Sequence, residues 1–476
     1  MLKNYFKIAW RNLEKNKFFG AINISGLAMG LAVGILLLLW VQDELSFDGF
    51  HKNGKNIFRA TAVFKQDNGG NIYWGTTPAP LAVFGKKEVP EIRNSCRLSD
   101  QWAVSFLEFK NQKIFDIKPG LADPSFFNVF SFSLLKGNPQ VPFPDDHSII
   151  LSESVAKKIF GSEDPMGKTL TTDNKDLFRV CGLMKDPPNH SSIRYNVIFN
   201  FDLLQHNYDG KGYWKSLNED WGNYNYDTYF QMQSGANPVS VGKKLSDIHR
   251  RNQPGDFTNV LSYVLQPLTH VHLYSVDGKD EGIRIVRIFF IVAIIVLMIA
   301  CINYTNLVTA RATKRAKEIS MRKIIGARKT TLFWQFLNET LLILVISLLI
   351  ATILIYLVLP LYNDIAGKQI VFHPYDLRVL FVYGCTFVVT LIMAGIYPAL
   401  TLSSFKPLEA LKGKFSVLGR DIVFRKFLVV VQFTFSVVLI VTTFIIGKQL
   451  QYLREKNLGY DKSNVLTFGF RGIGDH

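Results

Sequence analysis

The sequence contains little charge and little cysteine. Asp, Glu, Lys and Arg make up only 19% of its 476 residues, and four residues are cysteine. So few cysteines exclude a small scaffold held together by disulfides. Hydrophobic residues amount to 48%, a fraction that excludes an intrinsically disordered chain. Basic residues outnumber acidic ones, 54 to 38, so the formal net charge is +16.

Five stretches contain no charged residue at all, and each is 21 residues long or longer. About 20 apolar residues suffice to cross the hydrocarbon core of a bilayer. Within lipid a chain must satisfy its own backbone hydrogen bonds, so each stretch is expected to form a helix. We expect Pro398 to kink or end the fourth helix. The sequence thus predicts five membrane spans, at residues 18–42, 288–310, 340–362, 379–405 and 427–447.

The basic excess is confined to three short segments beside the spans. Residues 1–17, 311–329 and 403–426 together hold 19 basic and four acidic residues, whereas residues 43–284 hold 27 basic and 28 acidic ones. Basic loops stay on the cytoplasmic side of a membrane. We therefore expect a multi-pass protein of the cell inner membrane, with a cytoplasmic N-terminus and with residues 43–284 in the periplasm. Anionic lipid and this topology account for the positive charge, so no nucleic-acid partner is expected.

The long segment 43–284 is rich in aromatic residues and in short alternating runs, with frequent Gly and Pro, which is typical of a mixed α+β domain. Residues 1–17 place apolar and basic side chains on separate helical faces, which predicts a cytoplasmic amphipathic helix lying on lipid. The expected fold class is a multi-domain membrane protein. It combines an α-helical transmembrane bundle of five predicted spans with a large α+β extracytoplasmic domain inserted between spans 1 and 2.

The end of the sequence repeats the layout of its beginning. Arg425 and Lys426 precede an uncharged run, as the basic N-terminal segment precedes the first span, so a second copy of the unit is expected to begin near residue 425. Residues 414–426 would form a cytoplasmic linker, and residues 448–476 the start of a second extracytoplasmic segment. We accordingly expect the sequence to be shortened relative to a larger parent.

No local motif predicts a catalytic residue, a cofactor site or a metal site in this chain. The closest string to a phosphate-binding loop, residues 161–169, has five residues between its glycines where the Walker pattern needs four. His270 and His272 alternate in a strand-like pattern without a third metal ligand, and we interpret them as polar strand positions. Cys96 and Cys181 could pair in an oxidising compartment, but their spacing leaves this open.

The five spans contain no Asp, Glu, Lys or Arg. This argues against an ion-coupled transporter, because such a protein needs buried ionisable groups for its relay. The first span instead carries a helix-packing face of Gly26, Gly30 and Gly34, whose steps of four let another helix approach closely. That face could serve packing within the chain or a dimer seam between two copies.

One cytoplasmic loop, residues 311–331, contains a short helix-like stretch that ends at a glycine. Its apolar residues offer contact area and its basic residues offer charge. The stretch could simply lie on lipid as a positively charged loop, or it could be a docking helix for a cytoplasmic partner, and charge alone does not separate the two. The candidate residues of such a docking helix are Glu318, Ile319, Arg322, Lys323, Gly326, Ala327 and Arg328.

Several of these residues also carry a family resemblance. The docking-helix residues, followed by Gln335, Phe336 and Glu339 and by residues 395–399, resemble the signature of the FtsX-like permease domain, here over residues 285–413. Residues 43–48 and 186–191 resemble parts of permeases whose outer segment is a MacB-like periplasmic core, here residues 43–284.

The resemblance implies the membrane subunit of an ABC transporter of the mechanotransmission type. In that family a cytoplasmic ATPase, often a separate chain that holds the ATP and Mg²⁺, docks on the loop between the second and third spans. The candidate residues would then form an ATPase-coupling helix. The implied partners are this ATPase, a second permease copy or homologous half that completes a dimer, the lipid bilayer and, as a further candidate, a periplasmic adaptor.

The resemblance also implies a cargo class and a division of the outer domain. The cargo would be a hydrophobic or amphipathic substrate, such as an antimicrobial compound, a peptide or a lipoprotein, which is exported or extracted. The periplasmic core would have two lobes, with an inserted lobe near residues 106–222. Two other functions stay open: a transmembrane regulator or sensor that controls a partner protein without moving cargo, and a tethered extracytoplasmic enzyme, which would need a catalytic cluster that the sequence does not display.

Overall fold

The uncharged runs of the sequence form long helices. The computed structural model describes residues 2–66, 69–100, 104–173, 175–208, 215–253, 260–310, 319–368, 370, 372, 375–404 and 416–456. Within these ranges, five helices are long and apolar enough to cross a membrane, namely Lys17–Leu45, Glu281–Ala310, Lys329–Ala366, Leu377–Ser404 and Val423–Glu455. The expected fold class is therefore confirmed, since a mixed α and β domain lies in the chain between the first and second of these helices.

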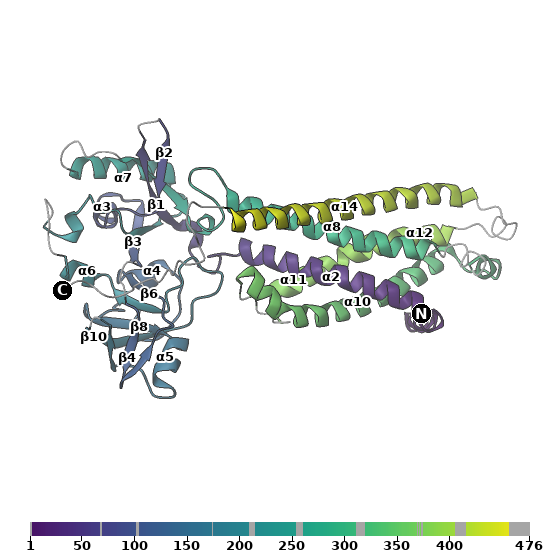
Figure 1. Ribbon diagram of the computed structural model, residues 1–476, viewed down its shortest axis with the longest axis horizontal. Coiled ribbons are helices and arrows are strands. Elements are labelled where there is room, and N and C mark those ends of the chain that lie inside the picture. Colours follow the sequence, from purple (N-terminus) through teal and green to yellow (C-terminus); the bar gives the residue numbers. More distant parts are fainter. Residues whose placement is uncertain are drawn as a thin grey trace. The chain divides into compact units, whose positions relative to one another are not determined.

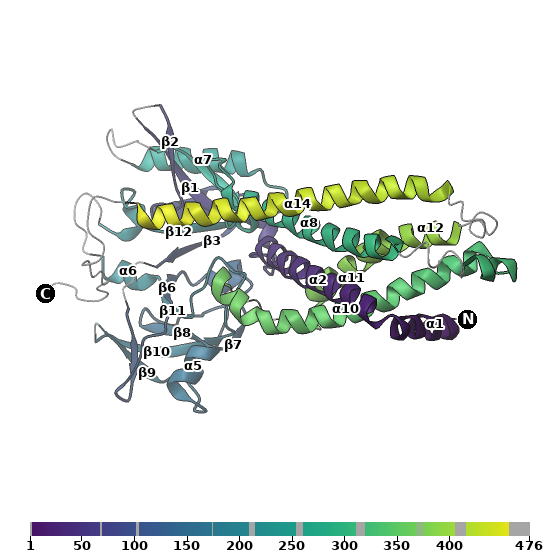
Figure 2. The same ribbon diagram turned by 45° about the vertical axis from the view of Figure 1, so that its right-hand side comes forward.

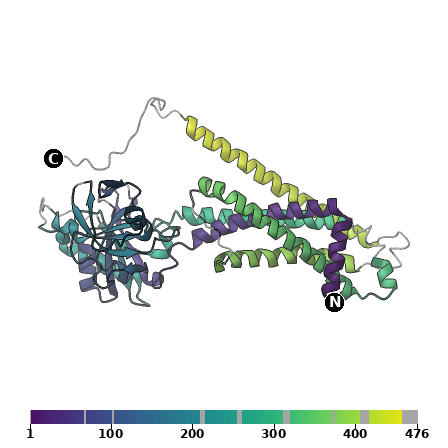
Figure 3. The same ribbon diagram turned by 90° about the horizontal axis from the view of Figure 1, so that it is seen from below.

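The chain divides into a helical unit and a sheet unit. The helical unit comprises Met1–Asp43 and Ile285–Val465, and the sheet unit contains Glu44–Arg284. The helical unit is drawn in Figures 1 and 3. Its elements are α1 (Leu2–Lys15), α2 (Lys17–Leu45), α8 (Glu281–Ala310), α10 (Lys329–Ala366), α11 (Leu377–Leu391), the π-helical turn η4 (Ile392–Ile396), α12 (Tyr397–Ser404) and α14 (Ser416–Glu455).

The core of the helical unit is apolar and is centred on α2. Leu27, Leu31 and Ile35, spaced by one helical turn each, are fully buried among side chains of α8, α10 and α11. Helix α14 stays apart from this core, and Figure 3 shows it running at an angle to the other helices. A ring contact of 4.7 Å between Tyr397 and Phe424 joins α14 to α12.

Pro398 does not end the fourth span. Helix α11 passes through the π-helical turn η4 directly into α12, and Pro398 occupies the first turn of α12. A proline normally leaves a carbonyl unpaired and crowds the preceding turn. The wider π turn accommodates one extra residue immediately before it, which lets the helix continue. Of the two expected effects of Pro398, a kink or an end, the end is excluded, and the π-helical turn directly before the proline is a place where helices commonly kink.

The sheet unit is built on one 13-stranded sheet with the order β13-β1-β12-β3-β6-β11-β8-β10-β9-β4-β5, in which β2 pairs with β1 and β7 with β10. Figure 2 shows the run from β3 to β9 in this order. The strands are β1 (Ile57–Lys65), β2 (Asn71–Trp74), β3 (Ile92–Ser99), β4 (Leu107–Phe109), β5 (Gln112–Ile114), β6 (Pro119–Ala122), β7 (Leu134–Lys136), β8 (Ser148–Ser152), β9 (Thr169–Thr172), β10 (Leu177–Met184), β11 (Val197–Asn200), β12 (Asp227–Met232) and β13 (Val260–Pro267).

Short helices cover the faces of this sheet. They are η1 (Gly54–Asn56), α3 (Pro80–Glu88), α4 (Phe126–Val129), α5 (Glu153–Phe160), α6 (Asp202–His206), η2 (Leu217–Glu219), α7 (Pro238–Asn252) and η3 (Leu268–His270). Leu81 of α3 and Leu245 of α7 pack on Phe230 of β12, whereas Ile159 of α5 belongs to a separate core with Phe178 of β10. Buried residues alternate with exposed or half-buried ones along β10, because successive side chains of a strand point to opposite faces and only one face of this strand is fully covered.

The chain leaves the first part of the sheet after β3 and returns to it at β12, and these two strands pair antiparallel with Cys96 opposite Tyr229. Strands β4 to β11 are built in between. This stretch contains the two parallel pairings of the sheet, β6 with β11 and β8 with β10. The inserted lobe expected near residues 106–222 falls on this stretch, and its boundaries stay a prediction.

Three sequence motifs were considered for metal binding, a disulfide and nucleotide binding, and the structure shows a different arrangement at each. His270 and His272 are not strand residues, because β13 ends at Pro267 and the chain turns into η3, so that expectation was wrong. No metal-binding cluster of His, Cys, Asp or Glu occurs within the described ranges. Cys96 and Cys181 are free thiols. Residues 161–169 form a turn that leads into the strand β9 and not into a helix N-terminus, where a phosphate would bind.

Candidate functional site

The stretch that the sequence offers as a docking helix, residues 319–328 of the described chain, is called the docking helix below, and its C-terminal end is well defined. Residues 319–324 are helical, and Gly326 follows with a φ of 103°. The N–H of Ala327 donates to the carbonyl of Arg322 at 2.9 Å, and the N–H of Gly326 donates to that of Lys323 at 3.0 Å. This pair of bonds is the Schellman arrangement, which needs a glycine at the residue with positive φ. Glu318 lies outside the described residues.

The inner face of the docking helix packs on two spans. Ile319 is buried, and it belongs to one apolar cluster with Leu332 and Phe336 of α10 and with Ala399 and Leu402 of α12. A fully buried aliphatic side chain contributes roughly 1.5–3 kcal/mol. The docking helix is thus attached to α10 and α12 by apolar contact.

Two basic side chains strengthen this attachment. Arg322 Nη1 donates to Oε1 of Gln335 at 2.8 Å, and Lys323 Nζ donates to the backbone carbonyl of Ser403 at 2.7 Å. Burial lowers the pKa of Lys323, and the charge of Lys329 lowers it further. Both residues were singled out in the sequence for their charge, and both turn toward the protein. Their partners were not predicted, since nothing in the local sequence marks Gln335 or Ser403 as an acceptor.

The outer face of the docking helix is apolar and is left exposed by the residues that the structure describes. The exposed fractions are 54% for Met321, 57% for Ile324 and 82% for Ile325, and Trp334 at the start of α10 is 55% exposed. Arg328 is exposed beside them, and Ala327 is half-buried under the helix end. The six described residues among the seven predicted ones therefore separate into an attached inner face and an exposed edge. The sequence had offered Met321, Ile324 and Ile325 for apolar contact, and together with Trp334, which it did not single out, they make up an apolar surface.

The helix-packing glycines of α2 lie against α8 of the same chain. A Cβ atom on Gly30 would lie 2.4 Å from Cβ of Ala300, and one on Gly34 would lie 2.6 Å from Leu297 Cδ2. A Cβ on Gly26 would lie 3.3 Å from Nδ2 of Asn303. The three glycines thus permit a close approach of α2 and α8, a contact that we call the glycine seam. It corresponds to the expected packing within one chain.

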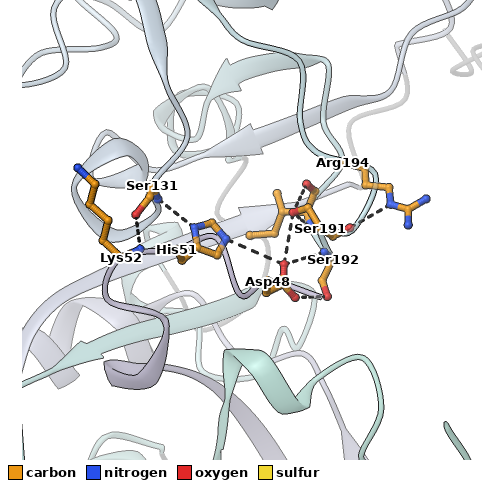
Figure 4. A network of polar contacts seen from close by, with 8 residues as sticks. Asp48, His51, Lys52, Ser131, Ser191, Ser192 and Arg194 are labelled. Carbon is orange, nitrogen blue, oxygen red and sulfur yellow. Dashed lines mark hydrogen bonds and ion pairs between the residues drawn. The ribbon is translucent and has the colours of Figure 1, made fainter. Parts of the chain in front are cut away.

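In the sheet unit, two distant motifs meet at Asp48. Its carboxylate accepts hydrogen bonds from the backbone N–H of Ser192 at 2.9 Å, from Ser192 Oγ at 2.5 Å and from Ser191 Oγ at 3.4 Å (Figure 4). Its own N–H donates to the carbonyl of His190 at 2.9 Å. Asp48 follows α2 directly, so these bonds tie the chain that leaves the first span to the loop at residues 189–194.

His51 completes this buried network. Its Nδ1 accepts a hydrogen bond from the N–H of Ser131 at 3.0 Å, and the N–H of Lys52 donates to Ser131 Oγ at 2.9 Å (Figure 4). His51 Nε2 lies 4.0 Å from Oδ1 of Asp48. Burial lowers the pKa of His51 to about 4 and raises the pKa of Asp48, although the bonds from Ser192 and Ser191 and the charge of His272 oppose the latter shift. The ring is therefore neutral near pH 7, and within the described residues it accepts the backbone N–H of Ser131 and lies beside Asp48.

Comparisons with protein families agree with the motifs. The model of the MacB-like periplasmic core domain matches residues 21–248, and that of the FtsX-like permease C-terminal domain matches residues 290–407. With these two domains in this order, the chain belongs to the MacB/FtsX-like family of ABC transporter permeases and is a multi-pass membrane protein.

Curated relatives are longer and share modest identity. The macrolide export ATP-binding/permease protein MacB of Neisseria meningitidis is 25% identical over 272 residues, which cover 56% of this chain and 38% of that protein. The protein of the same name from Burkholderia cenocepacia is 23% identical over 419 residues, which cover 85% of this chain and 57% of that protein. The chain thus spans only part of the length of these relatives.

Two solved structures show weaker similarity. A domain of a putative permease protein from Porphyromonas gingivalis is 22% identical, with a TM-score of 0.40 over 46% of this chain and 91% of the other. The periplasmic region of MacB from Actinobacillus actinomycetemcomitans is 17% identical, with a TM-score of 0.32 over 45% and 89%. These scores add nothing to the family assignment.

Proposed function

We propose that this chain is a permease subunit that transmits the stroke of a cytoplasmic ABC ATPase to its periplasmic domain. The ATPase, a separate chain, would dock on the docking helix, and the cargo would be hydrophobic or amphipathic. ATP and Mg²⁺ would belong to the ATPase, because residues 161–169 lead into a strand and do not fit a nucleotide. The name of the curated relatives, which refers to macrolide export, favours such a cargo.

The observation that carries the proposal is the apolar surface of Met321, Ile324, Ile325 and Trp334, which the described part of the chain leaves exposed. A contiguous exposed apolar patch beside polar residues marks a site of contact with protein or membrane. A helix that merely lies on lipid extends its Lys and Arg side chains toward the headgroups. Arg322 and Lys323 instead bond to α10 and α12, which favours a helix fixed by protein contacts with its apolar edge presented to a protein partner.

The same contacts define a route for displacement through the helical unit. The docking helix is attached to α10, and Ser347 Oγ of α10 donates to the carbonyl of Ile24 in α2 at 3.3 Å. The glycine seam then joins α2 to α8. These are the two helices whose chains continue into the sheet unit, which the distribution of basic residues assigns to the periplasm.

Ile325 offers a direct test of docking. The change Ile325→Asp places a charge on the exposed edge, and Ile365→Asp is the matched control, since Ile365 is 77% exposed at the other end of α10. We expect Ile325→Asp to reduce at least tenfold the amount of ABC ATPase that copurifies with the chain in mild detergent. ATP-dependent export of macrolides and of acylated peptides from proteoliposomes should fall with it.

The control should retain both the ATPase and the export. Full retention of the ATPase by Ile325→Asp would refute the docking role of this surface. ATP turnover that changes the activity of a partner protein while no cargo moves in the wild type would favour the regulator over the exporter.

A further inference from the structure

One histidine of the sheet unit touches both places where the chain joins the spans. His272 lies in the turn before α8, and its Nε2 is 2.6 Å from Oε2 of Glu44 in the last turn of α2. Its ring is stacked on the ring of Phe47, with centroids 3.5 Å apart and an angle of 8° between the planes. The Nε2–H can donate to Glu44 from either the neutral or the charged ring, so the contact does not require a particular protonation state.

Each side of this contact is held in place. Glu44 and Phe47 are both buried. On the side of α8, the N–H of Ile283 donates to the carbonyl of Leu273 at 3.0 Å. A Cβ on Gly282 would lie only 2.8 Å from that carbonyl oxygen, so the first turn of α8 lies directly against the residue after His272. A displacement of His272 must therefore displace the start of α8.

The loop at residues 189–194 contacts the same place. The guanidinium carbon of Arg194 lies 5.7 Å from the centre of the Phe47 ring, within reach of a cation–π interaction. Arg194 Nε and Nη2 donate to the carbonyls of Ser191 at 2.9 Å and Asn189 at 2.7 Å. This loop also binds Asp48, and it leads into β11. Contacts thus connect Phe47 to the loop that leads into the inserted part of the sheet.

We propose that Glu44, Phe47 and His272 form a clasp that makes the outer ends of the first and second spans move as one body. The hydrogen bond fixes the separation of the two chain segments, and the ring stack fixes their relative rotation. Without the clasp, a displacement of α2 could slip past α8 instead of moving the sheet unit. The inference rests on the proposed function, for which these three are positioning residues.

The test uses the full chain in lipid nanodiscs and, with its copurified ATPase, in proteoliposomes. His272→Phe keeps a ring for the stack and removes the N–H that Glu44 accepts. His270→Phe is the matched control, because the same substitution two positions earlier changes only a ring that lies 4.7 Å from Tyr274. We expect His272→Phe to keep ATP hydrolysis within twofold of wild type and to lower the cargo exported per ATP at least fivefold.

Amide hydrogen exchange supplies a second readout that needs no ATPase. Exchange at residues 273–283 should be at least tenfold faster in His272→Phe and unchanged in His270→Phe. Adding Glu44→Gln to His272→Phe should cause no further loss, because the phenylalanine has already removed the N–H that residue 44 accepts.

The outcomes separate the clasp from the proposed function. If the wild type exports no cargo with its ATPase, the proposed function fails, and exchange still decides whether the clasp holds the two segments together. Unchanged exchange in His272→Phe overturns the clasp. Faster exchange with an unchanged amount of cargo per ATP overturns its role in coupling, since the contact would then only stabilise the fold.

Discussion

Gly30 of α2 and Ala300 of α8 approach so closely that Gly30 cannot carry a Cβ atom. A Cβ on Gly30 would lie 2.4 Å from Cβ of Ala300, whereas the next nearest atoms, Cα of Ala300 and the carbonyl oxygen of Val296, lie at 3.6 and 3.9 Å. The conflict is therefore with a single methyl group. Between Gly30 and residue 300, the space between α2 and α8 holds one methyl group, which either helix could carry.

This geometry predicts a rescue by exchange. Gly30→Ala should destabilise the helical unit by about 1–3 kcal/mol, the usual cost of overpacking, and lower the midpoint of thermal unfolding in detergent. The double variant Gly30→Ala/Ala300→Gly should recover most of that loss of stability, because it moves the methyl group from α8 to α2 without adding a second one. If the glycines instead served a seam between two copies, adding Ala300→Gly would bring no recovery.

His51 predicts a pH dependence of stability. Its folded pKa of about 4 lies below the ordinary value of 6.5, so between these limits the unfolded chain binds a proton that the folded chain does not. Stability should then fall as the pH drops from about 6.5 to about 4, by roughly 1.4 kcal/mol per pH unit and about 3 kcal/mol in all. Above pH 6.5 this contribution is constant.

The measurement compares unfolding of the wild type with that of His51→Asn at several pH values. Asn does not titrate, and its Oδ1 can accept the N–H of Ser131 in place of Nδ1. The wild type should lose about 3 kcal/mol more than the variant between pH 7 and pH 4. Parallel stability curves for the two proteins would show that His51 is not held neutral by burial.

Gly326 predicts a purely conformational effect on the docking helix. Its φ of 103° is unfavourable for any side chain, yet no atom of the described residues lies within 4 Å of the position that a Cβ would take. Gly326→Val should therefore cost about 1–3 kcal/mol of local stability without a steric clash. Limited proteolysis should cleave residues 319–328 faster, and less ABC ATPase should copurify.

Gly384 is the matched control for this change. It also has open space around it, but it lies within the helix α11 and has no positive φ. Gly384→Val should leave the cleavage rate at residues 319–328 as in the wild type. Identical proteolysis of Gly326→Val and wild type would mean that the Schellman end does not hold the docking helix in shape.

Arg97 and Asp123 predict the cost of breaking a buried ion pair. The guanidinium of Arg97 donates to both carboxylate oxygens of Asp123, with Nη2 2.8 Å from Oδ1 and Nε 3.0 Å from Oδ2. Both side chains are almost fully buried. Asp123→Leu would leave a buried charge unpaired, so the free energy of unfolding of the sheet unit should fall by about 3–5 kcal/mol.

The double variant Arg97→Met/Asp123→Leu removes both charges and should regain part of this loss in chemical unfolding monitored by tryptophan fluorescence. Recovery should be incomplete, because the backbone N–H of Arg97 also donates to Asp123, at 2.7 Å, and would lose its acceptor. A double variant that is less stable than Asp123→Leu alone would contradict this assignment of the cost to the unpaired charge.

The membrane spans could be predicted because a single property, the absence of charge over 21 residues or more, determines them. The contacts of the docking helix could not. Arg322 binds a residue 13 positions further along the chain and Lys323 one 80 positions further, and no local pattern indicates either acceptor. The glycine that ends the helix was visible, because glycine is the residue most often found at the positive φ that follows a helix end.

The same limit applies to the sheet unit. Ser192 lies 144 residues from Asp48, so the two motifs could be recognised separately but not seen to meet. The strand expected at His270 and His272 was wrong because alternation alone was weighed, and Pro267, which ends β13, was not. His272 gained its contacts with Glu44 and Phe47 from that turn.

The π-helical turn at Ile392–Ile396 determines in which direction the side chains that follow it in the fourth span point. Each residue of a helix advances the direction of the side chains by about 100°. One surplus residue therefore rotates α12 by about that angle relative to a regular continuation of α11. Leu402 and Ser403 are buried as a result, with the Ser403 carbonyl beside Lys323. Deleting Ala394 would rotate Leu402 and Ser403 about the helix axis and break the hydrogen bond from Lys323 to Ser403. None of these three contacting residues would itself have been changed.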